Sequence, residues 1–170
     1  DTNLRLVQRY YDLLGKPEKI HVISRKNAYH GSTIAAGSLG GMSAMHAQTR
    51  GLGYIHHINQ PHWFAEGGDD SPEDFGIRVA RELEAKIDEL GEDKVAAFIA
   101  EPVQGAGGVI VPPASYWPEI RRICDERDIL LIMDEVICGF GRTGNWFGCE
   151  TYDLKPDLMT FAKAVTNGYI

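Results

Sequence analysis

Four places along the chain carry side chains that can do chemistry, each after a short apolar or β-leaning segment. They are Tyr29 with its neighbour His30, Glu101, Asp134 and Lys163. Parallel strands end at the same edge of a sheet, so groups that follow such strands can converge there. The sequence therefore predicts one site that combines an amine, two carboxylates, an imidazole and a phenol ring.

Lys163 follows the apolar residues Met159–Ala162. A lysine at the surface is the ordinary interpretation. A lysine at the end of a buried strand would instead be partly desolvated, which lowers its pKa and makes the amine a nucleophile toward aldehydes. On this second interpretation Lys163 forms a Schiff base.

Asp134 follows five apolar residues, Ile129–Met133. It could cap a helix or pair with a nearby arginine. It could also hold a protonated pyridine nitrogen, which allows pyridoxal phosphate to act as an electron sink. Tyr29 could pack in the core or present its ring to a cofactor, and Glu101 could be a surface acid. Each signal is weak alone, and their occurrence together favours the cofactor interpretation.

The elements that position these groups alternate between strands and helices. Apolar runs and β-leaning residues predict strands at 21–25, 95–100, 129–133 and 157–161. Helical spacing predicts helices at 4–14, after Ser32 or Thr33, at about 72–90 and at 115–127. Ser71 and Ser115 are predicted caps, and residues 50–70 are predicted to be mostly loop. This order predicts an α/β fold with a largely parallel sheet flanked by helices.

Composition narrows the class of protein. The chain has 170 residues, 44% of them hydrophobic, which suits one folded domain. Its formal net charge of −7 gives no electrostatic case for nucleic acid or an anionic membrane. The three cysteines form no CxxC pair, so we expect small core residues in a reducing, cytoplasmic setting.

Four segments together resemble a known family. They are Tyr29–Ser32 (YHGS), Glu101–Gly105 (EPVQG), Asp134–Gly144 (DEVICGFGRTG) and Phe161–Tyr169 (FAKAVTNGY). In sequence, order and spacing they resemble class III, fold type I, pyridoxal-phosphate-dependent aminotransferases, and the likeness covers essentially the whole chain. Within that family the chain looks most like the ω-transaminases, which include amine:pyruvate and putrescine:pyruvate enzymes.

The resemblance implies a role for each matching position. Lys163 would be the catalytic residue, bound to the cofactor as a Schiff base and later moving a proton. Asp134 would bind the pyridinium nitrogen. Tyr29 would stack on one face of the cofactor ring, and Val136 would pack on the other.

Other positions would support these. Glu101 would assist Asp134 or the cofactor surroundings, and His30, with Gly31 and Ser32, would shape the turn that holds Tyr29. Ala106 departs from the pattern of the ornithine and 4-aminobutyrate branch of the family. The resemblance implies that the matching position in that branch carries a glutamate, which pairs with a substrate-gating arginine. The alanine favours amines or diamines with pyruvate over 2-oxoglutarate.

The resemblance also implies that the chain is an internal fragment of one large cofactor-binding domain, residues 1–170. A phosphate-binding segment would precede it and a small C-terminal domain would follow it. A second copy would complete the site, so we expect a homodimer or higher homo-oligomer. The chain alone would then be inactive.

Other interpretations stay open or are disfavoured. A decarboxylase or aminomutase of the same fold would share the cofactor residues, and a non-catalytic α/β binding domain is the alternative from another class. Gly139, Gly141 and Gly144 match a dinucleotide fingerprint by letter, but no helix start follows the strand directly. His56, His57 and His62 lack accompanying carboxylate spacing, so we predict loop histidines and no metal site.

Overall fold

The computed structural model describes residues 1–48 and 50–169 of the chain. Thr49 and Ile170 lie outside the described part. In chain order the elements are α1 Thr2–Leu13, β1 His21–Arg25, α2 Ile34–Leu39, α3 Ser43–His46, β2 Ile55–Ile58, α4 Trp63–Glu66, α5 Pro72–Leu90, β3 Val95–Ala100, α6 Tyr116–Glu126, β4 Leu130–Asp134, α7 Gly148–Thr151, β5 Leu158–Thr160 and the 3₁₀ turn η1 Lys163–Val165.

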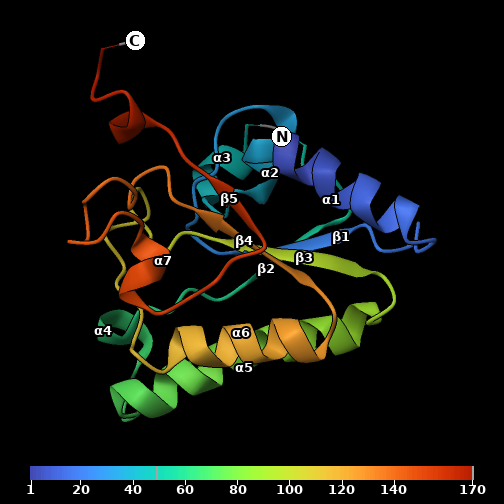
Figure 1. Ribbon diagram of the computed structural model, residues 1–170. Coiled ribbons are helices and arrows are strands. Elements are labelled where there is room, and N and C mark those ends of the chain that lie inside the picture. The colour runs from blue at the N-terminus through green and yellow to red at the C-terminus, as the bar shows by residue number, and fades with distance from the viewer. Residues whose placement is uncertain (49, 170) are drawn as a thin grey trace.

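The strands form one five-stranded sheet in the order β2-β1-β3-β4-β5, and every neighbouring pair is parallel. The predicted α/β fold with a parallel sheet flanked by helices is therefore confirmed. The carboxyl ends of the strands point to the left in Figure 1, toward α7 and the C-terminal segment. Polar residues that follow these strands consequently share one edge.

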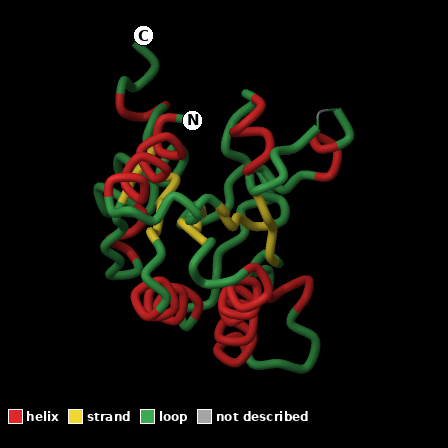
Figure 2. Tube along the Cα trace, turned by 90° about the vertical axis from the view of Figure 1, so that its right-hand side faces the viewer, coloured by secondary structure: helices red, strands yellow, loops and turns green. Residues whose placement is uncertain are grey.

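Helices cover the sheet on both faces, as Figures 1 and 2 show. On one face α5 and α6 pack against the sheet through a core that includes Phe75, Leu83, Trp117 and Ile120. On the other face α1 packs through Leu4, Val7 and Tyr11. All six residues of β3 are buried because this central strand is covered on both sides.

Local sequence explains where two helices begin. The Ser71 side chain accepts a hydrogen bond from the amide of Asp74 at 3.1 Å, and Pro72 occupies the first turn of α5. The Thr33 hydroxyl accepts from the amide of Ala36 at 3.1 Å and so begins α2. Ser71 was the predicted cap of α5, and Thr33 was one of the two candidates, Ser32 or Thr33, for the start of α2.

The predicted cap of α6 is wrong. Ser115 precedes α6 but makes no capping hydrogen bond. Its hydroxyl instead donates to the carbonyl of Glu73 at 2.7 Å and ties the start of α6 to the start of α5. The Ser115 hydroxyl, which the local sequence predicted to cap α6, is therefore used in a contact between two helices.

The predicted loop at residues 50–70 contains two short elements. Strand β2 pairs in parallel with β1, and helix α4 follows after four residues. His56 and His57 therefore lie in a strand, and the prediction that they are loop histidines is wrong. Four residues of Ile-His-His-Ile give too short a pattern to identify an edge strand between Gly53 and Pro61.

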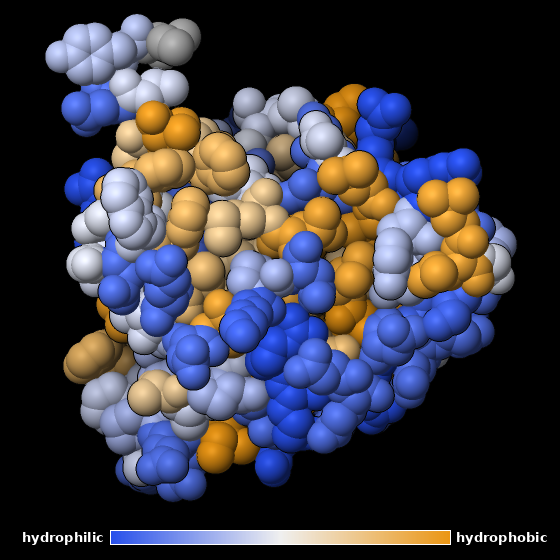
Figure 3. Space-filling view, viewed as in Figure 1, coloured by the Kyte–Doolittle hydropathy of each residue, from blue (hydrophilic) through white to orange (hydrophobic). Residues whose placement is uncertain are grey.

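The surface seen in Figure 3 divides by hydropathy. Hydrophilic side chains cover the lower half, over α5 and α6, whereas apolar side chains gather above, over α1 and the sheet edge at β5. Exposed apolar residues of α1 include Leu6, Tyr10 and Leu13. Among the described residues, no helix has the length and apolar character needed to cross a membrane.

Candidate functional site

Asp134 is the last residue of β4 and is 5% exposed. Nδ1 of His30 lies 2.7 Å from its Oδ2 atom, and the amide of Val136 donates to its Oδ1 atom at 3.1 Å. A buried carboxylate is stabilised in its charged form by such donors. The two bonds also fix the direction in which the carboxylate faces.

His30 was predicted only to shape a turn, but in the structure it contacts Asp134 directly. Its side chain is 2% exposed and bridges two strands, since Nε2 lies 3.2 Å from the hydroxyl of Ser24 in β1. Ser24, His30 and Asp134 thus form a continuous chain of hydrogen-bonding groups. Sequence reasoning missed Ser24, although a serine inside the apolar segment of β1 was a visible signal.

Glu101 follows β3 and is 4% exposed. Its Oε1 atom accepts from the amide of Tyr29 at 3.2 Å, and its Oε2 atom accepts from the amide of Gly105 at 2.8 Å. The carboxylate therefore holds the turn that carries Tyr29 and the loop after β3. Glu101 was predicted to assist either Asp134 or the surroundings of the cofactor. Its contacts fit the second role.

Tyr29 and Val136 are placed beside the Asp134 carboxylate by their backbones. Tyr29 precedes His30 and is 37% exposed, and Val136, half-buried, bonds Asp134 through its amide. Gly31, whose φ is +123°, lets the chain turn immediately after His30. Neither the Tyr29 nor the Val136 side chain is fully buried.

Lys163 opens η1, three residues after β5, and its side chain is exposed. Of the two interpretations that the sequence left open, the surface lysine is the one that fits the described residues. Its φ of 49° places a non-glycine residue in the left-handed region, which is uncommon and is found at functional sites. The Thr160 carbonyl accepts from the amide of Glu135 at 2.8 Å and fixes the strand that leads to Lys163.

Aromatic packing also anchors the segment before Lys163. Phe161 lies with its ring centroid 5.8 Å from that of Phe140 and 6.4 Å from that of Phe147. Phe140 and Phe147 meet edge to face at 5.4 Å. The glycine-rich segment thus packs against the chain two residues before the lysine.

Two further buried charged residues, which sequence reasoning left without a role, organise this edge. Glu135 is fully buried and accepts from the amides of Gly148 at 2.8 Å and Cys149 at 2.7 Å, so it caps α7. Arg25, also fully buried, donates to the Glu101 carbonyl at 2.5 Å and lies 5.5 Å from the Trp117 ring centroid. Both residues support the loops that carry the site.

The thiols near the site are poor nucleophiles. Burial raises the pKa of Cys138 to about 11 and that of Cys149 to about 12. Both therefore stay protonated near neutral pH and pack as small apolar groups, as the sequence predicted.

The other motifs weighed in the sequence have structural places. Gly141 and Gly144 have φ values of +91° and +93° in a run of turns, and the next helix begins only at Gly148. This is not the strand-to-helix turn of a dinucleotide site. His57 bonds the Gly40 carbonyl at 2.8 Å, and burial lowers its pKa. Within residues 1–48 and 50–169, no cluster of three or more potential metal ligands occurs.

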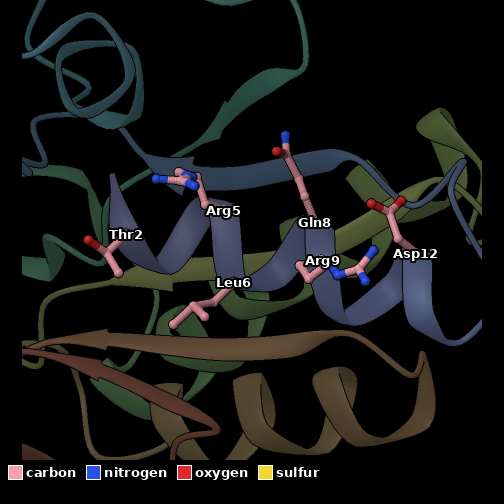
Figure 4. Close-up of a pocket in the computed structure, with 6 residues that line it drawn as sticks. All are labelled: Thr2, Arg5, Leu6, Gln8, Arg9 and Asp12. Atoms are coloured by element: carbon pink, nitrogen blue, oxygen red, sulfur yellow. The ribbon is translucent and has the colours of Figure 1, made fainter.

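Helix α4 carries two adjacent aromatic residues. Phe64 in α4 is 87% exposed, and Trp63 packs against the core and donates to the Asp70 carbonyl at 3.0 Å. A separate hollow, shown in Figure 4, lies along the outer side of α1 and contains none of the predicted site residues. Its lining residues are Thr2, Arg5, Leu6, Gln8, Arg9 and Asp12.

The whole chain matches one protein family, described as aminotransferase class-III, over residues 1–170. It is 60% identical to the putrescine–pyruvate aminotransferase of Pseudomonas aeruginosa, covering 100% of this chain and 38% of that protein. It is 47% identical to the chloroplastic gamma aminobutyrate transaminase 3 of Solanum lycopersicum, covering 100% of this chain and 33% of that protein. The chain thus spans between a third and two fifths of these relatives.

Solved structures agree with this match. A transaminase solved with L-alanine superposes with a TM-score of 0.97 at 46% identity, covering 100% of this chain and 41% of that one. An (S)-enantioselective omega-transaminase from Thermomicrobium roseum gives a TM-score of 0.96 at 43% identity, covering 99% and 38%. The predicted family is confirmed: this chain belongs to the class III aminotransferases.

Proposed function

We propose that the full-length protein containing this chain is a pyridoxal-phosphate-dependent aminotransferase. It would move an amino group from an amine or diamine to a keto acid, with pyruvate as the favoured acceptor. The observation that carries the proposal is the buried Asp134 carboxylate, oriented by His30 and Val136 at the edge that also receives Lys163.

The residues present fit the cofactor. An ionised carboxylate offers about four lone-pair positions, and Asp134 uses two of them for His30 and Val136. The remaining positions suit a protonated pyridine nitrogen, which would neutralise a charge that is costly to bury alone. Tyr29 and Val136 would supply the contacts to the two faces of the cofactor ring.

Bound pyridoxal phosphate would supply an electron sink for the carbon that bears the substrate amine. Lys163 would bind the cofactor through Nζ and then move a proton to and from the reacting carbon. The donor carbon is oxidised to a carbonyl, and the acceptor carbonyl carbon is reduced to an amine. Atoms and electrons therefore balance between the two substrates.

The substrate preference and assembly belong to the same proposal. Ala106 lies exposed in the loop after β3 and carries no carboxylate that could pair with an arginine, which supports amine or diamine donors with pyruvate. The 60% identical relative is a putrescine–pyruvate aminotransferase, which supports the same preference. We further propose that the protein is a homodimer or higher homo-oligomer, and its exposed apolar side chains support this. We also propose that the protein is cytoplasmic.

The test uses the full-length protein with added pyridoxal phosphate. Borohydride reduction followed by peptide mapping should place the cofactor label on Lys163, with carbonyl product formed from putrescine only when pyruvate is present. Lys163→Ala should abolish both, whereas Lys155→Ala, at an exposed lysine on the same segment, should change neither.

Three results would redirect the proposal. Release of carbon dioxide from an amino acid would favour a decarboxylase, and an isomeric amine as the product would favour an aminomutase. Label scattered over many lysines, with no bound cofactor, would favour a non-catalytic binding domain.

A further inference from the structure

Ser24 is a polar residue in a place where apolar residues prevail. It lies inside β1, one residue after the fully buried Ile23, and is itself fully buried. β1 is a central strand, paired with β2 on one side and β3 on the other. A hydroxyl in such a position is unfavourable unless it has a hydrogen-bond partner.

The partner of Ser24 is the His30 ring. The Ser24 hydroxyl lies 3.2 Å from Nε2, and the other ring nitrogen lies 2.7 Å from Oδ2 of Asp134. An ionised carboxylate only accepts hydrogen bonds, so Nδ1 must carry a proton. In the neutral ring Nε2 is then an acceptor, and the Ser24 hydroxyl is the donor that satisfies it.

We propose that Ser24 is a positioning residue that holds the His30 ring so that its Nδ1 proton faces Asp134, and thereby keeps the Asp134 carboxylate facing the cofactor nitrogen. The inference rests on the proposed function for the last of these links. Its first link, the orientation of the ring, depends only on the contacts among Ser24, His30 and Asp134.

Removing the hydroxyl has a defined consequence. With alanine at position 24, Nε2 would be buried without a donor, because the His30 side chain is only 2% exposed. Turning the ring so that Nε2 meets another donor would relieve this. Nδ1 would then no longer face Asp134, so the carboxylate would lose the donor at Oδ2, keep only the Val136 amide and no longer fix the ring tautomer.

The experiment uses the full-length protein with ¹⁵N-labelled histidine rings, with and without pyridoxal phosphate. His30→Asn identifies the His30 signals. In the wild type the Nδ1 shift should be that of a protonated nitrogen and the Nε2 shift that of an acceptor. Ser24→Ala should mix the two tautomers and weaken cofactor binding about fivefold, whereas Ser24→Thr, which keeps the hydroxyl, should restore both.

Ser38→Ala is the matched control. Ser38 is also buried, at 2% exposure, and its hydroxyl donates to the Ile34 carbonyl at 2.6 Å without touching His30 or Asp134. This variant should leave the His30 shifts and the cofactor affinity unchanged. Equal effects from Ser38→Ala and Ser24→Ala would overturn the proposal, since any lost buried hydroxyl would then suffice.

Two further results would overturn it. One is a Ser24→Ala protein with the tautomer and cofactor affinity of the wild type. The other is a wild-type His30 with its proton on Nε2, and this needs no variant to fold. If the wild type bound no pyridoxal phosphate, the proposed function would fail instead, and the ring shifts of the cofactor-free protein would still decide the role of Ser24.

Discussion

Asp134 is a buried carboxylate with two donors, one of which is the side chain of His30. Glu101 and Glu135 are as deeply buried, but their oxygens accept from backbone amides of neighbouring loops. Glu101 and Glu135 therefore fix the position of the backbone around the site. Asp134 alone of the three is bonded to an ionisable ring, His30, at 2.7 Å.

Replacing Asp134 with asparagine should therefore remove activity while keeping size and shape. An amide cannot neutralise a pyridinium charge, and its NH₂ group would face the donors of His30 or Val136. We expect kcat/KM for amine transfer in the full-length protein to fall at least about 100-fold. Asp69→Asn, at an exposed acid, should stay within about twofold of the wild type, and a similar result for Asp134→Asn would contradict the assignment.

Sequence alone could identify these residues but not their contacts. Asp134 and Lys163 were predicted from the apolar segments before them, and their roles came from the family resemblance. The bond between His30 and Asp134 joins positions 104 residues apart, so no local pattern encodes it. The sequence left Lys163 open to a surface or a partly desolvated interpretation, because burial depends on what covers η1, which the segment itself does not specify.

At the scale of elements, the end of β1 depends on a glycine from a distant turn. A Cβ atom built on Gly41 would lie 2.1 Å from the carbonyl oxygen of Arg25 and 2.7 Å from Cα of Lys26. The Gly41 carbonyl also accepts from the amide of Asn27 at 3.0 Å. The chain after α2 therefore lies directly against the turn that leads to His30.

Gly41→Ala should consequently destabilise the fold and displace that turn. Backbone atoms cannot give way cheaply, so we expect a loss of at least about 1–3 kcal/mol, measured by thermal or chemical unfolding, together with weaker cofactor binding. Gly53→Ala is the control, because nothing lies within 4 Å of its added Cβ and its φ is not positive. Equal stabilities for the two variants would show that the clash is relieved elsewhere.

Element prediction succeeded where a single local signal was strong. The bounds of β1 and β3 agree with the predicted segments, and α5 begins after the predicted cap, Ser71. It failed where tertiary contacts decide, as at Ser115, whose hydroxyl binds α5, and at β2, which exists because β1 offers it a partner. Long helices with clear ends are readable from sequence, whereas short edge strands are not.

At the scale of the whole molecule, ion pairs tie the two large helices together. Glu119 in α6 accepts from Arg122 on the same helix and from Arg81 in α5, both at 2.8 Å. The hydrogen bond from Arg122, with a further one from Arg81, lowers the pKa of Glu119 from 4.5 to about 2. The folded state therefore favours ionised Glu119.

A group with a lowered pKa stabilises the fold above its unfolded pKa and ceases to do so as pH falls toward the folded value. Glu119→Gln should accordingly lower the melting temperature at pH 7, and the difference from the wild type should shrink from about pH 5 downward. The Arg81 side chain is 61% exposed, so we expect the substitution to lower the free energy of unfolding by less than about 1 kcal/mol. A difference that stayed constant between pH 7 and pH 3 would contradict this account.

The Glu101 carboxylate also determines how the site can move. One of its oxygens binds the amide before His30, and the other binds the amide of Gly105, so two loops from different crossovers share a single anchor. Neither loop can open without breaking a bond to a charge buried at 4% exposure. The turn that carries Tyr29 and the loop that carries Ala106 are thus mechanically coupled through one side chain.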